Sequence, residues 1–187
     1  MNKLHLEYCA SDEWAALVTQ KIIPWATTGQ ELGDHVLEVG PGPGRTTEVL
    51  RTMFARLTAV ELDPALAAAL AKRLAGGNVE VIEADATDLP MDDGTFSAAV
   101  SFTMLHHVPT PELQDRLFAE VRRVLRPGAM FVGSDNLDTP AFRDGHIEDT
   151  CVPIDPATLT GRLKAAGFTS VEIETNPFAF RFAARKR

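Results

Sequence analysis

The residue types and spacing with the clearest chemical meaning lie in the segment 36–44, where a short apolar run is followed by three closely spaced glycines. Gly40, Gly42 and Gly44 alternate with prolines, and a helical pattern begins directly after them. A glycine turn at the carboxyl end of a strand lets a ligand lie against bare backbone, because glycine has no Cβ. The first N–H groups of the following helix point at the same place. The segment therefore predicts a ligand site.

Acidic residues stand at two informative distances from this turn. Glu38 precedes the first glycine by two residues, and Glu61 follows Gly40 by 21 residues at the end of a second apolar run. A carboxylate about twenty residues after a glycine turn commonly accepts hydrogen bonds from ribose hydroxyls, so Glu61 is predicted to bind a nucleoside. The dinucleotide fingerprint G-x-G-x-x-G would place its third glycine at position 45, where the chain has Arg45.

The pattern of Glu38 followed by G-x-G-x-G resembles motif I of the class I S-adenosylmethionine (SAM)-dependent methyltransferases. Three further segments resemble later motifs of that family and follow in its order, at 59–63, 79–90 and 96–107, and the segment 121–129 resembles the crossing into its fifth strand. The resemblance covers residues 34–135 and is nearest to the small-molecule group with a methyltransferase-11-like domain. It implies SAM as cofactor and S-adenosylhomocysteine as product.

The resemblance also implies roles for individual residues. Glu38 would lie beside the methionine ammonium, although it could also hold the N–H groups of the glycine loop. Asp85 would accept from the adenine amine, the backbone N–H of Ala86 would reach a ring nitrogen, and Leu62 would pack on the adenine. The cofactor-binding residues implied in this way are Glu38, Gly40, Gly42, Gly44, Glu61, Leu62, Asp85, Ala86, Ser101 and Phe102.

Candidates for catalysis and acceptor binding are less specific. His106 and His107 could include a general base, or they could serve loop packing and cofactor support. The irregular segment 135–155 is long for a compact domain, and long loops are often functional. Within it His146 and Asp149 could form a base and its orienting acid, but we favour a structural staple. The candidate catalytic residues are His106 and His146, and the candidate acceptor contacts are Tyr8, Trp14, His107, Phe142 and Asp149. Tyr8 and Trp14 fit a lid and core packing equally well.

The elements that must position these residues alternate between strand and helix. Strands are predicted at about 35–39, 57–61, 79–83, 96–102, 129–134, 170–175 and 178–183, and helices at about 12–25, 45–55, 64–74, 112–125 and 156–166. Ser11 suits the cap of the first helix, and Pro24 is expected to bend it. The last two strands have no helix between them and should form an antiparallel hairpin. The resemblance implies a Rossmann-like class I methyltransferase fold with helices on both faces and strand order 3-2-1-4-5-7-6.

Composition limits the class of protein and its partners. The chain has 187 residues, so we expect one domain over 1–187, with a helical lid segment 1–30 and a core 34–187. Its net charge of −8 argues against nucleic-acid or membrane binding, which favours a basic face. No histidine or cysteine spacing matches a zinc site, and no metal is expected. We therefore expect a cytoplasmic protein, a monomer or homodimer, that acts on a small-molecule acceptor.

Two other functions fit parts of the sequence. A dehydrogenase could hold NAD at the same place, although Arg45 and the expected terminal hairpin argue against it. A noncatalytic SAM-binding module would share every motif described above. The residues after Ser101 lack the Asn/Asp-Pro-Pro-aromatic turn by which related enzymes hold an exocyclic amine of a nucleic-acid base, and no Pro-Cys pair follows that strand. The atom that would be methylated is not specified by the sequence.

Overall fold

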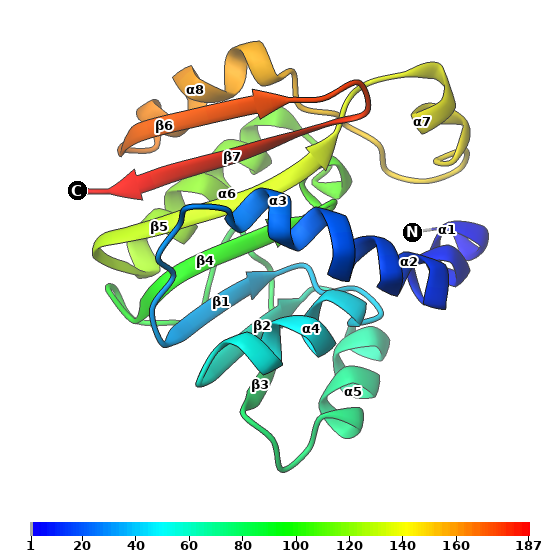
Figure 1. The fold of residues 1–187 in the computed structure, drawn as a ribbon, viewed down its shortest axis with the longest axis horizontal. Coiled ribbons are helices and arrows are strands. Elements are labelled where there is room, and N and C mark those ends of the chain that lie inside the picture. The colour runs from blue at the N-terminus through cyan, green and yellow to red at the C-terminus, as the bar shows by residue number, and fades with distance from the viewer. Residues whose placement is uncertain (1) are drawn as a thin grey trace.

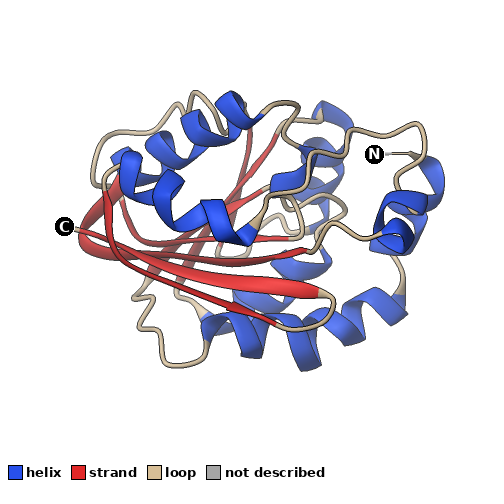
Figure 2. Ribbon diagram, turned by 90° about the horizontal axis from the view of Figure 1, so that it is seen from above, coloured by secondary structure: helices blue, strands red, loops and turns tan. Residues whose placement is uncertain are grey.

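A computed structural model describes residues 2–187. Met1, the first residue of the predicted domain and of its 1–30 segment, lies outside the described residues. The strands are β1 (His35–Val39), β2 (Arg56–Glu61), β3 (Val79–Glu83), β4 (Phe96–Phe102), β5 (Leu125–Asn136), β6 (Phe168–Thr175) and β7 (Ala179–Lys186). The α-helices are α1 (Lys3–Cys9), α2 (Asp12–Leu17), α3 (Ile23–Thr27), α4 (Arg45–Met53), α5 (Pro64–Arg73), α6 (Pro111–Val124), α7 (Pro140–Asp144) and α8 (Pro156–Ala165). They form layers on both sides of one sheet (Figures 1 and 2).

The seven strands lie in the order β3-β2-β1-β4-β5-β7-β6, as the resemblance implied. Strands β1 to β5 pair in parallel, whereas β7 is antiparallel to both of its neighbours. The predicted class I fold and its terminal hairpin are therefore confirmed. Because parallel strands end at one edge of the sheet, the loops after β1, β2, β3 and β4 open on the same side of the molecule.

Each face of the sheet carries its own apolar layer. Alternate residues of β1 point to opposite faces, so Val36 packs with α3 and α4, whereas Leu37 packs with α6 and α8. All five residues of β1 are buried, which agrees with a central strand covered on both sides. Because β1 is packed on both faces, the glycine turn that follows it has a fixed position at the edge of the sheet.

The N-terminal segment differs in part from the prediction. The Ser11 hydroxyl caps the helix that begins at Asp12, as expected. The helix is not uniform, however, because a π-helical turn spans Val18–Ile22 immediately before Pro24. Proline has no N–H and crowds the preceding turn, and the wider π-helical turn makes room for it. The irregularity that we expected at Pro24 therefore lies in the turn before it.

Two short helices were not predicted, and some strands extend beyond their predicted limits. Helices α1 and α7 have seven and five residues and contain no buried side chain, so their sequences lack the apolar stripe that marks a longer helix. Strand β5 begins at Leu125 rather than near residue 129, because a bulge in the pairing with β4 lets the exposed segment 126–128 interrupt its apolar pattern.

Candidate functional site

The glycine turn after β1 adopts a backbone that side chains would disturb. Gly40, Gly42 and Gly44 all have positive φ, at 69°, 55° and 88°. A Cβ atom on Gly40 would lie 2.1 Å from the Met104 side chain, and one on Gly44 would lie 2.3 Å from Leu70. The turn is therefore packed tightly between neighbouring segments, and glycine is required both for its conformation and for its space.

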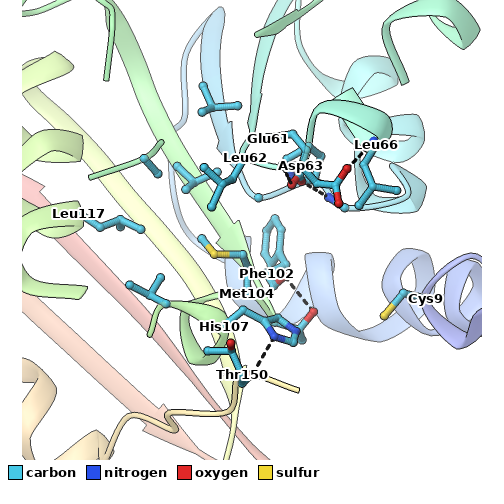
Figure 3. Close-up of a pocket in the computed structure, with 18 of the residues that line it drawn as sticks. Cys9, Glu61, Leu62, Asp63, Leu66, Phe102, Met104, His107, Leu117 and Thr150 are labelled. Atoms are coloured by element: carbon cyan, nitrogen blue, oxygen red, sulfur yellow. Dashed lines mark hydrogen bonds between the residues drawn. The ribbon is translucent and has the colours of Figure 1, made fainter. Parts of the chain in front are cut away.

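Glu61 links this turn to the end of β2. One carboxylate oxygen accepts from the backbone N–H of Gly42 at 2.8 Å, and the other accepts from that of Asp63 at 3.0 Å. Asp63 in turn caps α5, as its position before Pro64 indicated. The Glu61 side chain is 8% exposed and lies on the wall of a cavity (Figure 3). Each oxygen keeps a lone pair for a further donor.

Glu38 lies beneath the same turn. It is 2% exposed, and its Oε2 atom has no hydrogen-bond partner among the described residues. Burial raises the pKa of the Glu38 carboxyl to about 7, because an ion loses its hydration there. Glu38 is not part of the cavity wall. A buried carboxyl with one unpartnered oxygen is available to a cation or a donor that approaches through the glycine turn.

The cavity has a volume of about 510 Å³, within the range of about 300–1,000 Å³ that is usual for small ligands. Leu62 and Phe102 line it, and Figure 3 shows Met104 beside Phe102 in the same wall. The Asp85 carboxylate lies at the loop after β3 and accepts from the N–H of Thr87 at 2.8 Å. The ends of four strands therefore surround one pocket, as expected at the edge of this sheet.

The structure brings most of the predicted site residues to this cavity. Its wall includes Gly40, Gly42, Glu61, Leu62, Asp85, Ala86 and Phe102, together with the predicted acceptor contacts Trp14, His107 and Asp149. Seven predicted residues do not line it, namely Tyr8, Glu38, Gly44, Ser101, His106, Phe142 and His146. Ser101 is fully buried within β4, where its hydroxyl has no partner among the described residues, so its side chain does not contribute to the wall.

Sequence reasoning missed several residues of the wall. Leu117 reads as an ordinary core position of an amphipathic helix, and Cys9 lies on the short helix α1. Thr103 follows β4 and holds a φ of 50°, which is rare for a β-branched residue. Its backbone N–H donates to Ser134 of β5 at 2.8 Å, and this hydrogen bond fixes the strained conformation at the cavity. No sequence pattern signals such a residue.

The two candidate catalytic histidines form a buried chain beside the cavity. His106 Nδ1 lies 2.6 Å from Asp135 of β5, and its Nε2 lies 3.1 Å from Nε2 of His146. His146 Nδ1 lies 2.7 Å from the carbonyl oxygen of Phe142. His146 thus joins the loop 137–155 to the segment after β4, and its carbonyl oxygen accepts from the N–H of Asp149 at 3.0 Å.

The N-terminal segment closes one side of the cavity. The Asn2 amide donates to the carbonyl groups of Gly145 and Ile147, and its backbone N–H donates to Asp149 at 3.0 Å. Arg45, which replaces the third glycine of the dinucleotide fingerprint, donates to the carbonyl of Ala10 at 2.8 Å. Arg45 thus fastens the segment that follows α1 to the helix after the glycine turn.

Between residues 2 and 187, no helix combines the length and apolar character that crossing a bilayer requires.

Comparison with known proteins identifies the same region. Residues 37–133, more than half of the chain, match the family described as "Methyltransferase domain". A demethylmenaquinone methyltransferase from Clavibacter sepedonicus is 28% identical over 85% of this chain and 73% of its own length. A probable ribosomal RNA small subunit methyltransferase A from Natronomonas pharaonis is 40% identical over 48% of this chain, which spans 32% of that relative.

A solved structure shows how far the fold is shared. The crystal structure of a SAM-dependent methyltransferase from Aquifex aeolicus superimposes with a TM-score of 0.77 at 18% identity, and the match covers 100% of both chains. At this identity the likeness concerns the fold.

Proposed function

Because the chain belongs to the SAM-dependent methyltransferase-domain family, we propose that it transfers the methyl group of SAM to a small-molecule acceptor by in-line displacement. The observation that carries the proposal is the 510 Å³ cavity, in which Glu61 joins the glycine turn to the end of β2. Membership of this family sets aside the NAD-dependent alternative.

The residues on the cavity wall suggest how the cofactor is held. The free lone pairs of Glu61 would accept from the ribose hydroxyls, and Asp85 with the N–H of Ala86 would recognise the adenine. Leu62 is 67% exposed and would cover the face of the adenine ring. Glu38, beneath the turn, would attract the methionine ammonium through its unpartnered oxygen. In this assignment Gly44 and Ser101 shape the site without side-chain contact.

The chemistry requires little from the protein beyond alignment. Bound SAM supplies a methyl group that its sulfonium already activates. Phe102 and Met104 would position the methionine part, and the α1 segment with the loop 137–155 would exclude water. Alignment of this kind can contribute on the order of 7–11 kcal/mol. His106 and His146 do not line the cavity, so we assign no proton transfer to them.

A small molecule is the acceptor that the charge of the chain favours. The net charge of −8 would repel a nucleic-acid backbone, whereas a small molecule can enter a cavity of this size. The similarity to a probable ribosomal RNA methyltransferase keeps RNA as the second candidate. A noncatalytic SAM-binding module is the third, because the same wall would bind SAM without an acceptor.

One experiment separates these three functions. The protein is incubated with methyl-labelled SAM and, in separate reactions, with a metabolite extract and with total RNA. We expect label in a small molecule, whose mass identifies the acceptor. Label in RNA alone would contradict the acceptor class, and saturable SAM binding without any transfer would support the noncatalytic module. The Gly42→Val protein gives the background in each reaction.

A further inference from the structure

Four of the five histidines of the chain gather beside the cavity, although they come from distant parts of the sequence. His5 lies on α1, His106 and His107 follow β4, and His146 follows α7. The ring centroids of His5 and His146 are 4.4 Å apart, and those of His106 and His107 are 4.2 Å apart. One ring nitrogen from each of His5, His107 and His146 lies within 4.8 Å of the other two.

The surroundings of each ring determine which nitrogen carries the proton. Nδ1 of His107 lies 3.0 Å from the carbonyl oxygen of Thr150, and Nδ1 of His146 faces the carbonyl oxygen of Phe142. A carbonyl oxygen only accepts, so both Nδ1 atoms must be donors. Nδ1 of His5 faces the Asp149 carboxylate at 3.3 Å. In the neutral rings, each Nε2 atom therefore presents a lone pair.

In the neutral cluster, two of these lone pairs lack a donor among the described residues. Nε2 of His107 is buried and has no hydrogen-bond partner among the described residues. Nε2 of His146 faces Nε2 of His106 at 3.1 Å, and Nδ1 of His106 is occupied by Asp135. Two lone pairs at that distance repel each other unless a proton or another cation lies between or beside them. A proton on His106 or a metal ion would relieve this repulsion, and a metal ion would also give Nε2 of His107 a partner.

We propose that His5, His107 and His146 bind one divalent transition-metal ion, such as Zn²⁺, with Nε2 of His106 available as a fourth donor. Imidazole nitrogens suit Zn²⁺, Cu²⁺, Fe²⁺ and Ni²⁺. Metal-bound histidines usually donate their other N–H to a carboxylate or a backbone carbonyl, and all four rings here do so. These partners hold each ring in the tautomer that a metal requires.

The electrostatics of the cluster agree with a metal site. Burial lowers the pKa of His5 and His146, and it lowers the pKa of His107 to about 3, so these rings favour the neutral form that coordinates metals. The carboxylates of Asp135 and Asp149 lie behind the rings and would offset the charge of the ion.

Binding would draw the rings together. Two nitrogens that coordinate one tetrahedral zinc at about 2.0–2.1 Å lie roughly 3.3 Å apart, which His106 and His146 already approach. One ring nitrogen of each of His5, His107 and His146 lies within 4.8 Å of the other two, so a shared ion calls for movements of up to about 1.5 Å. Helix α1 has no buried side chain and can supply the movement of His5. A metal would thus clamp α1 onto the loop that contains His146.

The test measures metal binding by the untagged protein. After treatment with a chelator, we expect isothermal titration with Zn²⁺ to show one equivalent bound per chain. His5→Ala and His146→Ala should each weaken binding at least tenfold, because each removes a ligand. Zinc should also slow amide hydrogen exchange in residues 3–9 of the wild-type protein. Circular dichroism and SAM affinity report the folding of each variant.

His35→Gln is the matched control, since His35 is the remaining histidine and packs against Phe96 and Thr58 away from the cluster. This variant should bind Zn²⁺ as the wild type does. His5 lies on the surface helix α1, so His5→Ala decides the result even if His146→Ala fails to fold. Absence of a saturable equivalent in the wild type, or equal affinity in His5→Ala and wild type, would overturn the proposal.

Discussion

The two sides of the cavity are held by different kinds of interaction. On the side of the strand ends, backbone groups bond to backbone groups, as between Gly40 N–H and the Val60 carbonyl at 2.9 Å, or Ala84 N–H and the Glu61 carbonyl at 3.0 Å. On the side of α1 and the loop 137–155, side chains make most of the connections, chiefly Asn2 and the histidines, beside one backbone hydrogen bond from Val152 N–H to the His106 carbonyl at 2.7 Å. The first side is continuous with the sheet, whereas the second depends on a helix without buried side chains.

This difference has a functional consequence. A wall that is continuous with a buried sheet opens only when the sheet is disturbed, so it can hold a cofactor in one geometry. A wall whose helix has no buried side chain opens at lower cost, so it can admit an acceptor and close again. Substitutions on the strand side should therefore act on SAM affinity, and those on the helical side should act on turnover.

The largest effect is expected from Gly42→Val. Gly42 lies on the cavity wall and has a φ of 55°, a backbone conformation that a β-branched residue rarely adopts. SAM affinity, measured by calorimetry, should fall more than a hundredfold. Gly94→Val is the matched control, because Gly94 has a φ of 66° and open space around it. Near-normal SAM affinity in folded Gly42→Val protein would show that the turn does not contact the ligand.

Glu61→Ala should have the next largest effect. A carboxylate that accepts from ribose hydroxyls contributes about 1.5–3 kcal/mol, which corresponds to roughly tenfold to over a hundredfold in affinity. The substitution also frees the N–H of Gly42, and this loosens the turn. Asp88→Ala serves as the control, since the Asp88 side chain is 81% exposed and lies outside the cavity wall. Equal losses in both variants would contradict the role of Glu61.

The residues on the strand side of the cavity are also the ones whose positions could be predicted from the sequence. The turn at 40–44 and Glu61 belong to consecutive elements, so their spacing along the chain reports their distance in the fold. Strands and helices alternate along most of the chain, whereas the last two strands have no helix between them. This pattern was sufficient to indicate the antiparallel hairpin. The sequence did not indicate toward which face of the sheet the Ser101 side chain points. Successive side chains of a strand point to opposite faces, and in a buried strand both faces are covered.

The helical side could not be read in the same way. His5, His107 and His146 come together only after the sheet has folded, and no spacing rule relates positions so far apart. The short helices α1 and α7 bury no side chain and leave no apolar period in the sequence. The absence of zinc spacing along the chain therefore said nothing about a site assembled from three separate segments.

Glu38, on the strand side of the cavity, should make SAM affinity depend on pH. Burial raises the pKa of its carboxyl to about 7, so the group is largely protonated at pH 6 when SAM is absent. The ionised carboxylate is the form that attracts an ammonium, and its proton must leave as SAM binds. SAM affinity should therefore rise roughly five- to tenfold from pH 6 to pH 7.5 and change little above that.

Glu38→Gln provides the control for this pH dependence, because glutamine has nearly the same shape and does not titrate. The affinity of this variant should be lower at pH 7.5 and nearly constant between pH 6 and 7.5. A variant that keeps the full pH dependence would assign it to another group and would remove Glu38 from the ammonium site.

The smallest effect, and the one that tests the helical side, is expected from Asn2→Ala. This change removes the amide that donates to Gly145 and Ile147 at 3.2 and 3.0 Å, and it removes the cap of α1. Loss of a cap and two partly exposed hydrogen bonds costs about 1–2 kcal/mol, which loosens α1 without disturbing the sheet. Turnover of the identified acceptor should fall several-fold while SAM affinity stays within twofold of the wild type. Thr28→Ala, at the end of α3 and outside the cavity wall, should leave both unchanged. A loss of SAM affinity equal to the loss of turnover would mean that α1 supports the cofactor, and the two sides would then act as one.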